Sequence, residues 1–115
     1  MDAVRALADL VEISPQIEAA AVVGADGAID GTIGAPEARA DVLARSLREL
    51  LEGAGAFRAD GGHVTQVHAE LAEGQVFAVA GADGRAIVAV TGGGSAPGLL
   101  FYDLKRCLAA VAGAT

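Results

Sequence analysis

Three strand-like runs joined by two tight turns lie within residues 64–91, and this pattern constrains the fold more than any other. The runs are VTQVHAEL, QVFAVAG and RAIVAVT, and they are separated by Glu73-Gly74 and by Asp83-Gly84. Each run is rich in residues that favour strands, and each turn contains a glycine, which tolerates positive φ. The sequence therefore predicts an antiparallel meander.

The three runs differ in polarity, and the difference predicts their surroundings. In the first run, Gln66, His68 and Glu70 alternate with apolar or small residues, which is typical of a strand with one polar face near a sheet edge. The other two runs, 76–80 and 86–90, are apolar at almost every position, so we expect both of their faces to be covered. Helices should therefore lie on both sides of the sheet.

Composition limits the classes of protein that the chain can belong to. Its 115 residues suit one domain, residues 1–115, and the core must depend on Leu, Val and Ile because only 3% of the residues are aromatic. A net charge of −7 argues against nucleic acid and anionic membranes as partners. One cysteine and no leader-like N-terminus predict a reducing cytoplasm. The apolar runs are too short to span a bilayer.

The rest of the chain reads as helices and two further strands. We expect helices at 2–13, 36–53 and 97–112, and strands at 17–24 and 28–33. The run 28–33 is short and polar, which suits a sheet edge. In the first helix, we assign the core-facing stripe to Val4, Leu7, Ala8 and Val11.

The second expected helix has the strongest amphipathic pattern. Pro36 suits its first turn and Gly53 a C-terminal cap. Its broad apolar face comprises Ala40, Leu43, Ala44, Leu47, Leu50, Leu51 and Ala54. Beside this face lies a flank of Ala38, Val42 and Ser46, whose small side chains would let a partner helix approach closely. A solvated surface explains the same flank equally well.

The phrase Gly-Ala-Asp-Gly occurs twice, and both copies read as turns. Asp26-Gly27 and Asp83-Gly84 each place a glycine, which can adopt positive φ, after an aspartate that can bond to its own backbone. Neither aspartate has a second carboxylate or a histidine at ligand spacing, so metal binding is not expected.

A search for catalytic groups finds no constellation. His63 and His68 lie in no zinc spacing, and we take His68 as an uninvolved surface histidine, or else as part of an edge where a second chain pairs. Cys107 falls in an apolar stripe, which favours a core residue over a nucleophile. The glycine run 92–95 lacks the Gly-Lys-Ser/Thr ending of a nucleotide loop, so it reads as a connector. We expect no catalytic residue, metal or cofactor, and a binding or regulatory role instead.

Over nearly its whole length, the chain resembles the roadblock superfamily, which includes dynein light chains and MglB-like regulators of Ras-like GTPases. The likeness lies in the element order, in AAVVGADG at 20–27, in the helix from Pro36, in the meander, and in GLLFYDLKR at 98–106. It implies a three-layer α/β/α sandwich around a five-stranded antiparallel sheet. With strands numbered along the chain, the implied strand order is 2-1-5-4-3.

The resemblance also implies a non-enzymatic homodimer that binds a small Ras-like GTPase, as an activator or as a scaffold. Dimers of the superfamily join through the second helix and the third strand. The corresponding positions in this chain are Ala38, Val42, Ser46, Glu49, Thr65, Gln66, Val67, His68 and Ala69. Exposed arginines on the helix, candidates for GTPase contact, are Arg39, Arg45 and Arg48. The chain ends soon after its last helix, so we expect no C-terminal extension and favour binding over activation. The alternative is a PAS/GAF- or profilin-like module that binds a small molecule.

Overall fold

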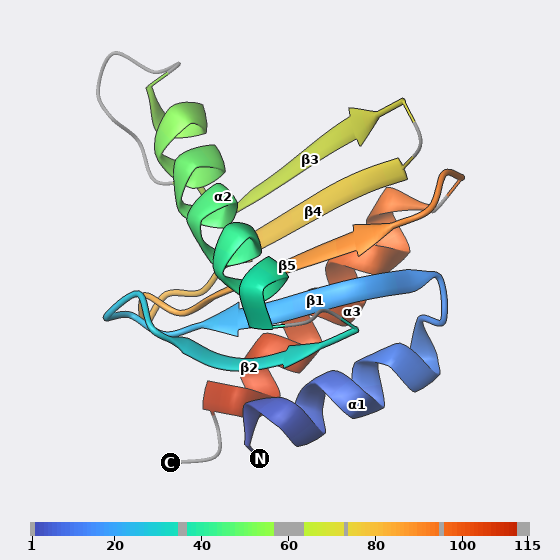
Figure 1. Ribbon diagram of the computed structural model, residues 1–115, viewed down its shortest axis with the longest axis horizontal. Coiled ribbons are helices and arrows are strands. Elements are labelled where there is room, and N and C mark those ends of the chain that lie inside the picture. Colours follow the sequence, from blue (N-terminus) through green and yellow to red (C-terminus); the bar gives the residue numbers. More distant parts are fainter. Residues whose placement is uncertain (1, 35–36, 57–63, 73, 95, 113–115) are drawn as a thin grey trace.

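The computed structural model describes residues 2–34, 37–56, 64–72, 74–94 and 96–112, apart from the side chains of residues 37 and 38. The elements are α1 (Ala3–Ile13), β1 (Ile17–Val23), β2 (Ile29–Ile33), α2 (Glu37–Gly55), β3 (Gln66–Leu71), β4 (Gly74–Ala80), β5 (Ala86–Thr91) and α3 (Pro97–Ala112) (Figure 1). Their order is the expected one. Outside the described residues lie Pro36, His63, Glu73 and Ser95.

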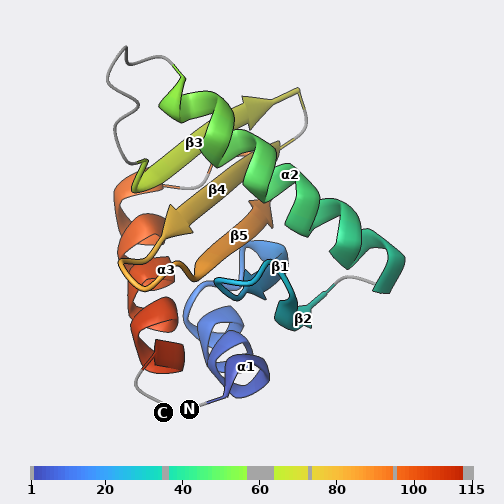
Figure 2. The same cartoon turned by 90° about the vertical axis from the view of Figure 1, so that its left-hand side faces the viewer.

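A single antiparallel sheet organises the molecule. Its strand order is β2-β1-β5-β4-β3, which places β2 and β3 at the two edges, as expected. Helices α1 and α3 lie on one face of the sheet, and α2 crosses the other face (Figures 1 and 2). The expected three-layer α/β/α sandwich is therefore confirmed.

Each face of the sheet has its own hydrophobic cluster. On the side of α1 and α3, Phe77 is fully buried and meets Phe101 edge-on, with ring centroids 5.4 Å apart. On the side of α2, Leu43 and Leu47 pack with Val88 of β5. Because side chains alternate between faces along a strand, the apolar runs of β1, β4 and β5 supply both clusters. This is why those runs contain few polar residues.

The two Gly-Ala-Asp-Gly phrases form turns of the same kind, which confirms their interpretation. Asp26 Oδ1 accepts a hydrogen bond from the Ala28 N–H, and Asp83 Oδ1 accepts one from the Arg85 N–H, both at 3.0 Å. The glycine after each aspartate has positive φ, 85° at Gly27 and 90° at Gly84. The turn is therefore set by local chemistry, and the same residues produce it in both hairpins.

The core-facing stripe of α1 differs from the expected one. Buried residues are Ala3, Ala6, Leu7 and Leu10, whereas Val4 is 60% exposed and Ala8 is also exposed. The small side chains let α1 approach β2 closely, since a Cβ placed on Gly31 would lie 3.0 Å from the Ala3 Cβ. Both stripes have helical spacing and share Leu7, so periodicity alone could not separate them.

Helix α2 runs past its expected end. It continues to Gly55, and Gly53 is helical rather than a cap with positive φ, so that prediction is wrong. Nothing lies within 4 Å of a Cβ built on Gly53, so the solvent side of the helix tolerates the glycine there. The apolar face of α2 is as expected, with Ala40, Leu43 and Leu47 buried. The bounds of α3 also agree with the sequence prediction.

Candidate interaction surface

The outward flank of α2 carries one of the exposed apolar side chains of the molecule. Val42 is 50% exposed, Ser46 is half-buried, and Glu49 is exposed. These three residues lie at helical spacing on one side of α2, as the sequence indicated. The side chain of Ala38 lies outside the described residues.

In the part of the sheet that the structure describes, no strand pairs with the outer side of β3. The Thr65 carbonyl accepts a hydrogen bond of 2.9 Å from the Ala80 N–H of the neighbouring hairpin. Bonding alternates along an antiparallel strand, so the odd-numbered residues of β3 bond to β4. The N–H and C=O groups of Gln66, His68 and Glu70 therefore point to the free edge of the described sheet. Such an edge is a ready template for another strand.

His68 differs from the surface histidine that we expected. It is half-buried, and its ring stacks on Phe77 of β4 with centroids 4.5 Å apart and planes 8° from parallel. Its Nε2 also lies 3.1 Å from Nε2 of the buried Gln75. Because Phe77 in turn contacts Phe101, the edge strand is connected to the core beneath α3. The expectation of an uninvolved surface residue is therefore wrong, since the neighbouring strand supplies a partner that spacing could not reveal.

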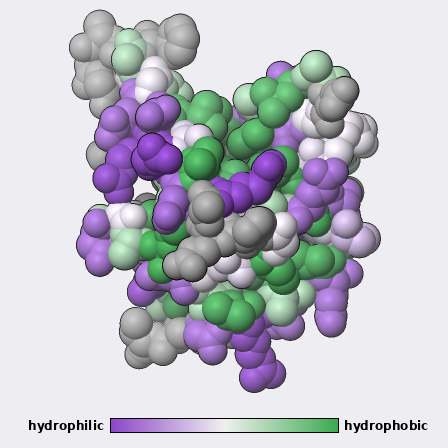
Figure 3. Space-filling model, in the orientation of Figure 1, coloured by the Kyte–Doolittle hydropathy of each residue, from purple (hydrophilic) through white to green (hydrophobic). Residues whose placement is uncertain are grey.

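The other face of β3 is apolar and only partly covered. Val67 is half-buried and packs against the cluster beneath α2, while Leu71 at the far end of the strand is 59% exposed. Figure 3 shows hydrophilic side chains over α2 and apolar surface at the top of the molecule, where α2 and β3 diverge. The open edge and this apolar surface are therefore continuous.

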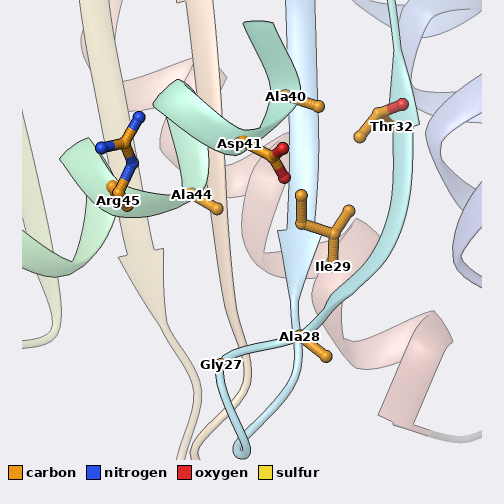
Figure 4. Close-up of a pocket in the computed structure, with 8 residues that line it drawn as sticks. All are labelled: Gly27, Ala28, Ile29, Thr32, Ala40, Asp41, Ala44 and Arg45. Atoms are coloured by element: carbon orange, nitrogen blue, oxygen red, sulfur yellow. The ribbon is translucent and has the colours of Figure 1, made fainter. Parts of the chain in front are cut away.

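A hollow separates the N-terminal half of α2 from the edge strand β2. Its volume is about 780 Å³, and it is lined by Gly27, Ala28, Ile29, Thr32, Ala40, Asp41, Ala44 and Arg45. Figure 4 shows Asp41 extending into it from α2 and Ile29 from β2. A register shift between Val22 and Val23 brings Ile29 to the α2 side of the sheet. No sequence pattern indicated this hollow, because it depends on how α2 crosses the sheet.

The three candidate arginines of α2 are all exposed, but they are not equivalent. The guanidinium of Arg48 lies so close to Gly27 in the turn between β1 and β2 that a Cβ at that glycine would clash with it. Arg45 lines the hollow. The structure therefore keeps Arg48 against its own chain and brings Arg45 to a concave surface.

The whole arrangement is similar to a crystal structure of a Roadblock/LC7 domain from Streptomyces avermitilis. The TM-score is 0.85 at 24% sequence identity, and the match covers 98% of this chain and 97% of that chain. This chain has the roadblock fold.

Other solved structures with a similar fold extend the comparison. Myxococcus xanthus MglB matches with a TM-score of 0.66 at 12% identity, over 86% of this chain and 76% of that one. A chain of the LokiProfilin2/rabbit actin complex matches with a TM-score of 0.66 at 15% identity, over 96% of each. No family model matches the sequence, and no curated protein matches it. At these identities, the likeness concerns the roadblock fold itself.

Within this roadblock fold, the lone cysteine belongs to the core, as the sequence indicated. Cys107 is 6% exposed, and burial, together with the nearby negative charge of Asp9, raises the pKa of its thiol from 9.0 to about 11. A thiol that stays protonated at neutral pH is a poor nucleophile. Among the described residues, no cluster of His, Cys, Asp or Glu is arranged to hold a metal ion, and no described helix is long and apolar enough to cross a membrane.

The helical layer opposite α2 has an apolar groove that sequence reasoning missed. It lies between α1 and α3, has a volume of about 230 Å³, and includes Ile13, which is 67% exposed. The nearby Tyr102 is 58% exposed and lies under the guanidinium of Arg106, 5.9 Å from the ring centroid. The roadblock fold therefore leaves apolar surface on both helical layers.

Proposed function

We propose that this protein is a non-enzymatic homodimeric adaptor that binds a small Ras-like GTPase. The observation that carries the proposal is the open β3 edge beside the exposed flank of α2, on a chain with the roadblock fold. A free edge and a small-residue helix flank are surfaces that a second protein chain can cover. The resemblance to MglB-like regulators of Ras-like GTPases indicates the class of partner.

The proposed dimer joins α2 to α2 and β3 to β3. On the helix, Val42, Ser46 and Glu49 would lie at the seam together with position 38. On the strand, the segment from Thr65 to Ala69 would meet its counterpart, so that two five-stranded sheets form one continuous sheet. A partner strand would supply hydrogen-bond partners for the outer backbone groups of β3, which pair with no other strand of the described sheet.

The proposed GTPase contact uses the arginines of α2. Arg39 and Arg45 are exposed, and Arg45 adjoins the hollow at β2. The net charge of −7 makes these cations local exceptions on an acidic protein, so they can orient an acidic surface of the partner. Arg48 already packs on the turn at Gly27, and we assign it a supporting role. The proposed contact accounts for binding of the GTPase and does not require that GTP hydrolysis be stimulated.

Two measurements test the proposal in sequence. Sedimentation velocity over a range of concentrations should detect a dimer, and a species that stays monomeric at all concentrations would contradict the homodimer. Immobilised protein should then retain Ras-like GTPases of its own organism. The retained amount is measured once in the presence of GDP and once in the presence of a non-hydrolysable GTP analogue. An Arg39→Glu/Arg45→Glu variant should lose the GTPase while remaining dimeric. A control Arg85→Glu variant, with one charge reversal in the turn before β5, should retain it.

Small-molecule binding is the second candidate function, and the hollow at β2 is the observation that favours it. Its volume of about 780 Å³ lies within the roughly 300–1,000 Å³ range of ligand sites. Its lining of alanines offers few anchors besides Asp41 and Arg45, which is why we place this candidate second. Metabolite mixtures added to the protein would shift the NMR signals of Ile29 and Thr32 if a small molecule binds in the hollow. Such shifts, together with no binding of a GTPase, would make small-molecule binding the first candidate function.

A further inference from the structure

Helices α1 and α3 run antiparallel and leave an apolar groove between them, on the layer opposite α2 (Figure 2). We propose that this groove binds a basic amphipathic helix of a further protein partner. The groove is built from a single chain, so pairing of two copies through α2 would leave it open. An adaptor joins at least two partners, and this surface supplies a second site that does not depend on the proposed GTPase contact.

Exposed apolar side chains gather at one end of the groove. Ile13, at the end of α1, lines it and is 67% exposed. On α3, Leu99 is 70% exposed and lies one turn before the lining residue Asp103, while the adjacent Tyr102 is 58% exposed. Half of the large exposed apolar side chains among the described residues therefore lie here. Such a gathering on a protein surface indicates an interaction site.

The shape of the groove suits a helix. Its other end is lined by Ala6 and Ala110, whose small side chains let a third helix approach α1 and α3 closely. The volume of about 230 Å³ is below the roughly 300 Å³ at which small-molecule sites begin. Both walls are helices, so an extended peptide would find no sheet edge to pair with. An amphipathic helix covers such a groove with apolar anchors at helical spacing.

Two carboxylates make the seam between the helices negative. Asp103 accepts a hydrogen bond of 2.7 Å from the Ser14 hydroxyl at the end of α1, so it lies at the seam. Burial and, after it, the charge of Asp9 raise the pKa of the Cys107 thiol, so the field of Asp9 reaches the opposite wall. Arg106, the one cation of the lining, instead lies over an aromatic ring of its own helix. Charge complementarity therefore assigns lysine or arginine to the partner helix, and the same carboxylates disfavour an anionic membrane.

Selection from a peptide library tests the inference. Phage display helical peptides of 16 residues, the length of α3, and the library is first depleted on an Ile13→Ser variant and then selected on the full wild-type chain. Enriched peptides should carry lysine or arginine beside apolar residues at helical spacing. In fluorescence anisotropy, a synthetic copy should bind Ile13→Ser about tenfold more weakly, because the variant loses an apolar side chain that is 67% exposed in the free protein. Val4→Ser removes an exposed apolar side chain of α1 outside the groove and should bind within about twofold of wild type.

A charge variant provides a second readout with the same peptide. Asp9→Asn should weaken binding about two- to fivefold at low salt and not at high salt, since salt screens the lost attraction. The control Asp41→Asn removes an exposed carboxylate from α2 and should bind as wild type does. Circular dichroism should show all four variants folded.

Three outcomes would overturn the inference. The first is enrichment of acidic helices, and the second is a selection that yields no helix able to distinguish wild type from Ile13→Ser. The third is an Ile13→Ser protein that sediments as a smaller species than wild type, because a second copy would then occupy the groove. A protein that sediments as a monomer and still binds the basic helix would contradict the homodimer and support the groove.

Discussion

Replacing Val42 by glutamate should weaken the proposed dimer strongly. Val42 is 50% exposed in the single chain, so the seam would bury about half of its side chain. Complete burial of a valine contributes roughly 1.5–3 kcal/mol, so half contributes about 1 kcal/mol per subunit. Two-fold symmetry doubles this to about 2 kcal/mol, which is about 30-fold in the dimer dissociation constant. The charge of glutamate adds a desolvation cost, so 30-fold is a lower bound.

Sedimentation equilibrium measures the effect directly, and α1 offers a matched control. Val4 is 60% exposed on the opposite helical layer. A Val4→Glu variant changes the net charge equally and should leave the dissociation constant within about twofold of wild type. Circular dichroism should show both variants folded. A Val42→Glu protein that dimerises as tightly as Val4→Glu would refute the placement of α2 at the seam.

Three further predictions concern the fold. Gly27→Ala should destabilise the protein by about 1–2 kcal/mol, because the left-handed φ of 85° strains a Cβ there. Gly53 is helical, so Gly53→Ala should stabilise the protein by about 0.5–1 kcal/mol. Urea unfolding of the two variants measures both effects. Burial raises the pKa of the Cys107 thiol from 9.0 to about 11. As pH rises between these values, the thiol ionises in the unfolded chain before it does in the folded one, so the free energy of unfolding should fall by about 3 kcal/mol. A Cys107→Ala variant should lack this part of the pH dependence. Ser14→Ala removes a buried hydroxyl that donates to Asp103 Oδ2 at 2.7 Å, and chemical denaturation should show a loss of about 1–3 kcal/mol.

Errors in the sequence-based predictions share one cause. The stripe of α1 was placed on Val4 and Ala8 because alanine-rich helices offer several faces of similar hydrophobicity. Glycine often ends helices, which predicts a cap at Gly53, yet α2 continues to Gly55, beyond Leu51, which packs against the cluster on this face of the sheet. His68 shares a strand face with the polar Gln66 and Glu70, which predicts a surface position, but Phe77, which stacks on its ring, comes from another strand. In each case a distant segment decided between local alternatives.

The sequence alone determined the elements, the turns and the two edges of the sheet. Asp-Gly pairs act on their own backbone, and the hydrophobic period is a local property, so both can be read without coordinates. The tertiary structure alone decided which backbone groups of β3 face outward, how α2 opens a hollow over β2, and that Arg48 rests on Gly27. These features depend on the relative placement of segments distant in the chain, and packing, rather than local propensity, sets that placement.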